Sequence, residues 1–367
     1  MCRMKRVPLL ALIVLTSCGS SDAAPAPAQR FSVHEWGLIA VASADSLDAV
    51  AMTGGVEVTS DPSGARLFED LAPPGALRDA VGLKPVVYVH VEGAGDVNLS
   101  VRVTAPAGKM LEVAPTPARG PENEARWIGL RAGGASCPTP PVSRAACHAE
   151  DHYCEALEDP FYDTRTASCL HLRDGSTRNH LFYRARVDAA QLPFAVTWSD
   201  DGTVRVHNNG DVAVPGPAFR IRGGYRGLAI TRFNPPAPGA DVDVPPPTSG
   251  DAASTRAAII AALLGRGLDD AEARAFDTAW AHILFGEPIP PAVAALDVGR
   301  APAALAASTE VILYLLPDAL VTRVLPLDVD PPPTAIHRAL YVRMAITPTV
   351  LPTPPEPDWR HGIRTGS

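Results

Sequence analysis

Residues His34, Glu35, Trp36 and Gly37 bring two proton-handling side chains, an indole and a glycine together where the folded part of the chain is expected to begin. Histidine and glutamate serve in general acid–base catalysis, and both bind zinc. The helical zinc-protease motif needs a second histidine four positions after the first, and Leu38 stands there instead. That motif is therefore absent.

The tetrapeptide is predicted to open a strand over 31–41, in which successive side chains face opposite sides of a sheet. His34 and Trp36 then share one face and Glu35 lies on the other, which argues against a catalytic His–Glu pair within the tetrapeptide. The favoured interpretation is a strand start whose His and Trp are half-buried and hydrogen-bonded. A catalytic or ligand-binding role for His34, Glu35 and Trp36 is the alternative.

A second group of reactive side chains lies in one loop, which contains four cysteines: Cys137, Cys147, Cys154 and Cys169. An even number of cysteines in an exported chain predicts disulfides. Two bridges would each stabilise the fold by about 2–4 kcal/mol. Of the three pairings that four cysteines allow, the one between sequence neighbours, Cys137–Cys147 and Cys154–Cys169, is favoured.

The same loop suggests a metal site as an alternative, because His148, His152 and His171 interleave with the cysteines and zinc accepts thiolate and imidazole. No two cysteines stand at the close spacing from which structural zinc sites usually start, so disulfides are preferred. Acidic residues in the loop would also suit weak calcium binding. No cofactor is predicted; zinc and calcium are the alternatives.

Several enzyme signatures are absent from the chain, namely the nucleophile elbow, the phosphate-binding loop, the Ser-x-x-Lys motif and the dinucleotide fingerprint. Paired carboxylates of the kind that hydrolyse glycosides leave no local spacing signature. The sequence therefore leaves catalysis undecided and favours a protein without it.

The first residues predict export and lipid anchoring. A basic start followed by a short apolar stretch is typical of a signal peptide, here over 1–17. The run Leu15-Thr16-Ser17-Cys18 resembles a bacterial lipobox, which implies acylation at Cys18. Several acyl chains give stable membrane binding.

Residues 18–30 are a Pro/Ala-rich tether. Because Gly19 rather than Asp follows the cysteine, the expected location is the cell envelope, at the outer membrane.

Net charge narrows the range of partners. It is −8 for the whole chain and −11 once the signal peptide is removed. An acidic body without basic blocks argues against nucleic acid. The expected partners are the membrane, through the lipid anchor, and an unidentified protein or polymer ligand.

The body of the chain is predicted to be mainly β with some α structure. Short strands with Gly/Pro turns over 31–235 favour a β-sandwich-like domain that includes the Cys-rich loop 137–169. Hairpins are predicted between 86–91 and 97–103, and between 194–198 and 203–207, where Asp-Gly forms the turn. Residues 236–250 are predicted to be a Pro-rich linker without a paired strand.

A helical hairpin is predicted over 251–288. Gly265 is expected to end its first helix, and Asp269 with Glu272 resembles a capping box at the start of the second. A C-terminal strand group follows over 306–347, with strands at 309–316, 323–329 and 339–347. It is expected either to pack on the helical hairpin or to return to the front sheet. Residues 348–367 form a Pro-rich tail.

Five segments together carry a family resemblance: VHEWG at 33–37, KPVVYVHV at 84–91, LFYRARV at 181–187, GLDDAEARAFDTAW at 267–280 and EVILYLLPDALVTRVLPLDVDPPP at 310–333. In this order they resemble a family of uncharacterised secreted bacterial proteins that open with a His-Glu-Trp-Gly strand. The resemblance implies one exported unit in which the helices belong with the β-domain. It implies no activity.

The functional expectation is a membrane-anchored envelope lipoprotein with a non-catalytic binding or structural role. One alternative is a hydrolase of an envelope or extracellular polymer, with His34 and Glu35 near its cleft. Another is a metal-binding module built on the loop 137–171.

Overall fold

The computed structural model describes residues 29–41, 66–67, 79–137, 164–223, 228–285 and 310–346. The predicted signal peptide, Cys18, most of the tether and the Pro-rich tail lie outside these residues. So does the stretch 138–163 of the Cys-rich loop, which contains four candidate site residues: Cys147, His148, His152 and Cys154.

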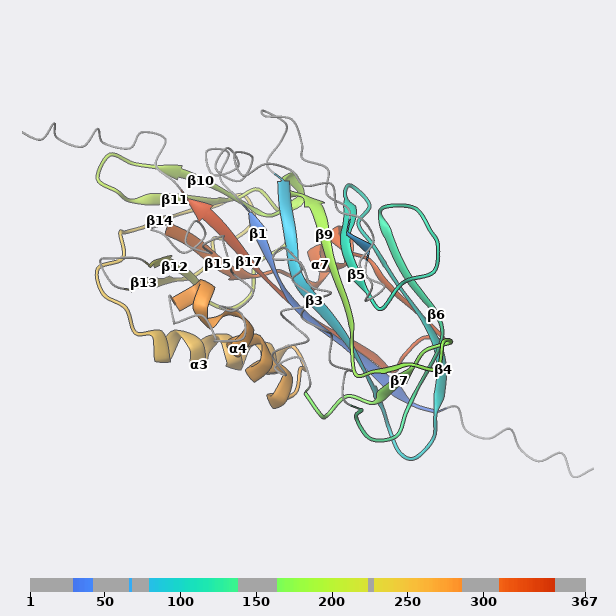
Figure 1. The fold of residues 1–367 in the computed structure, drawn as a ribbon. Coiled ribbons are helices and arrows are strands. Elements are labelled where there is room, and N and C mark those ends of the chain that lie inside the picture. The colour runs from blue at the N-terminus through green and yellow to red at the C-terminus, as the bar shows by residue number, and fades with distance from the viewer. Residues whose placement is uncertain are drawn as a thin grey trace, which may run out of the picture.

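A nine-stranded sheet forms the centre of the molecule, in the order β13-β12-β15-β17-β1-β3-β9-β5-β2 (Figure 1). Its strands are β1 (Phe31–Val41), β2 (Arg66–Leu67), β3 (Asp79–Val91), β5 (Lys109–Ala114), β9 (Leu181–Asp188), β12 (Ala218–Arg222), β13 (Ala229–Phe233), β15 (Glu310–Leu315) and β17 (Ala335–Ile346). Among the described strand pairs, β1 with β17 is parallel and the others are antiparallel. The C-terminal strands β15 and β17 therefore return to the front sheet, one of the two positions expected for the C-terminal strand group.

Two smaller sheets and three helices complete the described fold. The five-stranded sheet contains β16 (Leu327–Asp330), β4 (Val97–Thr104), β6 (Glu124–Gly133), β7 (Cys169–His171) and β8 (Thr177–Arg178), and the three-stranded sheet contains β10 (Phe194–Trp198), β11 (Val204–Asn208) and β14 (Asp241–Val244). The helices are α3 (Ala252–Gly265), α4 (Asp270–Phe285) and α7 (Asp318–Val324). None of the described helices is long and apolar enough to cross a membrane.

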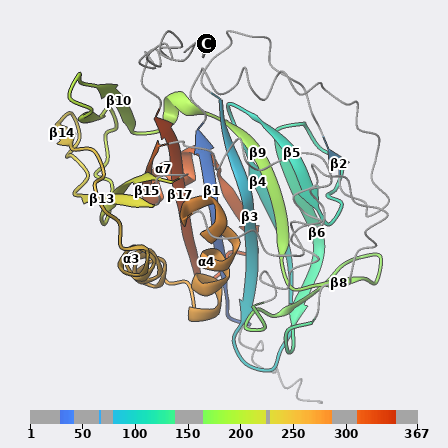
Figure 2. The same ribbon diagram turned by 60° about the vertical axis from the view of Figure 1, so that its left-hand side comes forward.

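The central sheet buries both of its faces. Val33, Val87 and Tyr183 on one face pack in a core with Val101 and Trp127 of the five-stranded sheet. On the opposite face, a second core joins the sheet to α3 and α4 (Figure 2). It includes Trp36, Tyr88, Phe182, Phe276 and Trp280. The molecule is therefore a β-sandwich with a helical hairpin on one outer face, as the sequence predicts.

The hairpin predicted between 86–91 and 97–103 is wrong, because β3 and β4 belong to different sheets. From Val86 to Val89, β3 is buried on both faces, and it pairs with β1 and β9. In β4, buried side chains alternate with more exposed ones, which suits a sheet with one covered face. The difference in burial, rather than the turn between the strands, decides their partners.

The segment 236–250 is also more ordered than predicted, since β14 lies within it and pairs with β11. The prolines flank the Asp-Val-Asp-Val strand and so do not interrupt its ladder. The strand predicted over 323–329 is wrong in part: α7 ends at Val324, and β16 begins at Leu327 after Pro326.

The predicted helices are present, with one change at their junction. Helix α3 continues through Gly265 to the cap residue Arg266. The glycine that ends it is Gly267, whose φ of +87° is a left-handed conformation that few other residues adopt.

Candidate functional site

Three histidines form a row across the helix-facing side of the central sheet. We call His337 of β17, His34 of β1 and His90 of β3 the histidine row. His34 and His337 are register partners on parallel strands, and His90 pairs with Ser32. The ring centroids of His34 and His90 are 4.1 Å apart, and His337 meets His34 edge-on at 4.9 Å. Side-chain alternation places all three imidazoles on one face.

Glu272, in the first turn of α4, lies against this row with its side chain fully buried. His34 Nδ1 donates to Glu272 Oε2 at 2.8 Å, and His90 Nε2 donates to Glu272 Oε1 at 2.9 Å. Both oxygens of one carboxylate therefore accept a hydrogen bond from an imidazole. The three residues come from segments far apart in the chain.

The capping box predicted at the start of α4 fixes the position of Glu272. The backbone N–H of Asp269 donates to Glu272 Oε2 at 3.0 Å, and the N–H of Glu272 donates to Asp269 Oδ1 at 2.8 Å. These reciprocal bonds satisfy two N–H groups at the helix start. The same carboxylate therefore caps α4 and joins that helix to the sheet.

The carboxyl group of Glu272 is ionised at neutral pH. Burial by itself raises its pKa, but the hydrogen bonds from His34 and His90 outweigh burial and lower the pKa to about 2. A divalent cation could bind between the buried carboxylate and the two imidazoles, where it would replace the two imidazole protons.

The turn between α3 and α4 also holds the third histidine of the row. His337 Nδ1 donates to the carbonyl oxygen of Arg266 at 3.2 Å. A Cβ atom on Gly267 would lie 2.2 Å from His337 Nδ1, so only glycine lets this turn approach the ring so closely. On β1, Ser32 Oγ lies 3.2 Å from His34 Nε2 and orients that imidazole.

The donor set suits zinc. The ligand atoms of His34, His90 and Glu272 all lie within 4.8 Å of one another. Zinc binds imidazole and carboxylate with bonds of ~2.0–2.2 Å, which separates neighbouring ligand atoms by roughly 3.3 Å in a tetrahedral site. The nitrogen–oxygen separations of 2.8 and 2.9 Å would need to open by a few tenths of an ångström, and the widest separation in the group, at most 4.8 Å, would need to close.

Glu35 lies on the opposite face of the sheet from His34, as strand alternation predicts. Its fully buried carboxylate accepts a hydrogen bond from Tyr183 Oη at 2.6 Å and a second from Arg338 Nε. Burial and the nearby negative charge of Glu35 raise the pKa of Tyr183. Glu35 therefore belongs to a buried ion pair in the sandwich core, and it does not contact the histidine row.

Trp36 belongs to the core beneath the helices. Its ring centroid lies 5.8 Å from that of Phe276 in an edge-on arrangement, and 6.4 Å from that of Tyr88. It helps to seat α4 on the sheet.

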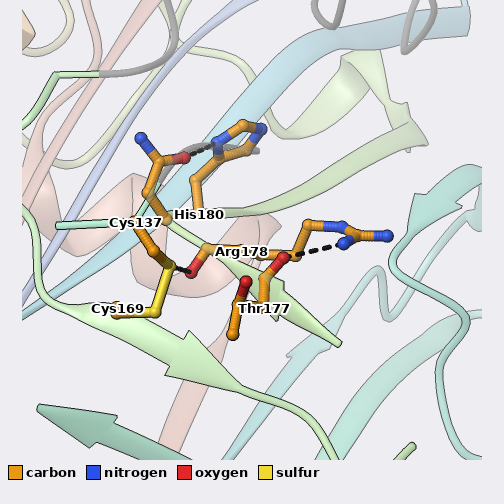
Figure 3. Close-up of a disulfide and its surroundings, with 6 residues drawn as sticks. Cys137, Cys169, Thr177, Arg178 and His180 are labelled. Atoms are coloured by element: carbon orange, nitrogen blue, oxygen red, sulfur yellow. Dashed lines mark hydrogen bonds between the residues drawn. A yellow bond between two sulfur atoms is a disulfide. The ribbon is translucent and has the colours of Figure 1, made fainter. Parts of the chain in front are cut away.

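In the Cys-rich loop, Cys137 is bonded to Cys169 (Figure 3). The predicted pairings Cys137–Cys147 and Cys154–Cys169 are therefore both wrong. Cys169 pairs with Gly133 across β6 and β7, and Cys137 follows β6 closely, so the strand ladder brings these two cysteines together. Sequence proximity is a weaker guide than strand pairing here.

This disulfide removes two thiolates from the metal site predicted on the loop. His171 lies on β7 as the register partner of Arg131, away from the histidine row. The remaining candidate ligands, Cys147, His148, His152 and Cys154, lie outside the described residues.

Sequence reasoning singled out His34 but did not assign His90, Glu272 or His337 to a site. Glu272 was identifiable only as a capping residue, and His90 only as part of a strand. Three of the segments behind the family resemblance, VHEWG, KPVVYVHV and GLDDAEARAFDTAW, each supply one member of the His–His–Glu cluster. Strand register, which the sequence does not state, brings them together.

No family model matches the chain, and a search of curated proteins returns no match. The resemblance to the family of secreted bacterial proteins therefore stays a prediction.

Proposed function

We propose that this protein is an exported, lipid-anchored envelope protein that binds one divalent transition-metal ion, zinc in the first instance, through His34, His90 and Glu272. The observation that supports it is the meeting of two imidazole nitrogens at one buried, ionised carboxylate. These are the residue types that zinc uses outside thiolate sites.

The surroundings of the cluster favour an ion over a purely structural contact. A capping box needs one carboxylate oxygen, and here Oε1 lies outside the cap and is directed at His90. Ser32 beside His34 Nε2 resembles the outer-shell partners that orient metal-binding histidines. The side chains of His34 and His90 are 11% and 19% exposed, so an ion could reach the cluster from the imidazole side.

The predicted anchor would place this cluster near a membrane. His34 is the fourth residue of β1, and β1 follows the tether directly. A tether of about a dozen residues can extend at most ~3.3–3.6 Å per residue, or roughly 40 Å. We propose that the protein holds its ion close to the lipid surface.

Calorimetric titration of the mature chain, purified in detergent and stripped with a chelator, tests this function. One equivalent of zinc is expected to bind. His34→Ala, His90→Ala and Glu272→Gln should each weaken binding by more than about 100-fold, beyond the usual cost of losing an outer-shell partner.

His207→Ala is the matched control, because His207 also pairs with a carboxylate, Asp241, but at an exposed position on the three-stranded sheet. It should leave zinc affinity unchanged. A double variant in which His148 and His152 are both replaced tests whether the Cys-rich loop, rather than the cluster, binds the zinc. If zinc binding survives all three cluster variants and is lost in the loop variant, the cluster is not the metal site.

A further inference from the structure

We infer that the His34–His90–Glu272 cluster is an open metal site, in which three protein ligands hold the ion and an exchangeable position takes a small oxyanion from solution. This inference rests on the proposed metal binding and adds the class of ligand that the bound ion would accept.

The number of ligands is the first argument. Within the part of the chain that the structure describes, three residues bring ligand atoms within 4.8 Å of one another. Structural zinc sites are closed by four protein ligands, whereas sites built from two histidines and one carboxylate keep a position for an exchangeable ligand. The cluster has the composition of the second kind.

Among the described residues, His337 is the further imidazole in contact with His34, and its position argues against its being a fourth ligand. It is not a member of the group whose ligand atoms converge. Its Nδ1 already donates to the Arg266 carbonyl oxygen, and Gly267 packs against the ring. The turn between the helices therefore holds this imidazole beside His34 rather than over Glu272.

Charge indicates the kind of exchangeable ligand. Imidazoles bind metals in their neutral form, so a divalent ion with two histidines and one ionised carboxylate keeps a net charge of about +1. The carboxylate of Asp269, three residues before Glu272, is engaged by the backbone N–H of Glu272. An anion at the remaining position would neutralise the centre, and oxygen ligands such as carboxylate or phosphate groups suit zinc.

The exposure of the two imidazoles is consistent with exchange of a small ligand at the open position. Glu272 is fully buried on the helix side, whereas the side chains of His34 and His90 keep partial exposure. A small ligand would therefore approach along the imidazole side, near the ends of β1 and β3. The capping box and Ser32 hold two of the ligands in place before the ion binds, which favours an ordered site with a defined open position.

The mature chain loaded with cobalt(II), which takes zinc's place and absorbs visible light, tests this inference. Addition of acetate or phosphate should shift the absorption bands with saturable dependence on anion concentration. X-ray absorption of the zinc form should count two imidazoles rather than three. Comparing acetate with phosphate shows which oxyanion class binds more tightly.

His337→Ala is the decisive variant. An open site predicts that metal affinity changes by less than about threefold and that the anion response persists, since the loss of a true ligand would cost far more. A cobalt spectrum that ignores both anions, or a large loss of affinity in His337→Ala, would overturn the open site while leaving metal binding intact. The absence of any cobalt spectrum would instead contradict the proposed function itself.

Discussion

At the scale of single residues, neighbours in sequence have separate roles because a strand turns them to opposite faces. His34 contacts Glu272 beneath the helices, and Glu35 contacts Tyr183 and Arg338 in the sandwich core. Strand alternation allowed this split to be predicted from the sequence. The partners could not be predicted, because they come from positions between 148 and 303 residues away.

The two neighbours should respond differently to substitution. Glu35→Gln leaves Arg338 charged and without its buried partner, which should cost about 3–5 kcal/mol of unfolding free energy, yet zinc affinity should hold. His34→Ala should abolish zinc binding at a smaller cost of about 1–2 kcal/mol. Urea denaturation of the metal-free chain and zinc titration measure the two effects. Equal loss of zinc affinity in both variants would contradict the separation of the faces.

At the scale of elements, the short turn between α3 and α4 holds Glu272 and His337 against the sheet. It contributes the carbonyl oxygen that orients His337, the glycine that allows close approach, and the capping box that positions Glu272. Both helices and the capping box were predictable from local patterns. The β3–β4 hairpin was predicted wrongly because burial on both faces of β3 outweighs the turn signal that follows it.

Gly267→Ala tests the importance of this turn. The methyl group of the alanine would meet the His337 ring, and the alanine would have to adopt a left-handed backbone. The variant should therefore lose about 2–4 kcal/mol of unfolding free energy, from backbone strain together with the clash. Gly239→Ala is the control, since Gly239 also has a positive φ of +73° but open space around its Cβ position. It should lose only about 1 kcal/mol. If Gly267→Ala and Gly239→Ala lose similar amounts of unfolding free energy in denaturation experiments, the contact with His337 does not stabilise the fold.

At the scale of the whole molecule, three features join segments that are distant in sequence: the parallel pairing of β1 with β17, the sandwich of two sheets, and the disulfide between Cys137 and Cys169. Composition and strand patterns were enough to predict the β-sandwich with helices. The order of strands and the disulfide partner were not predictable, because they depend on which ladders form between remote segments.

The disulfide can be tested directly. Peptide mapping of the non-reduced protein should recover a fragment that links Cys137 to Cys169, which are 32 positions apart. Cys137→Ser should lower the free energy of unfolding by about 2–4 kcal/mol, because a loop of that length is no longer closed in the unfolded chain. Recovery of a Cys137–Cys147 fragment instead would show that sequence neighbours pair after all.

The parallel pairing of β1 with β17 also constrains the time at which the protein can fold. Thr334 bonds to Phe31 across 303 positions, so one of the first strands to be synthesised must wait for one of the last. Until β17 emerges, β1 lacks one neighbour and has an unpaired edge that could join other chains. A prematurely terminated chain would therefore keep this edge unpaired and be open to aggregation or proteolysis.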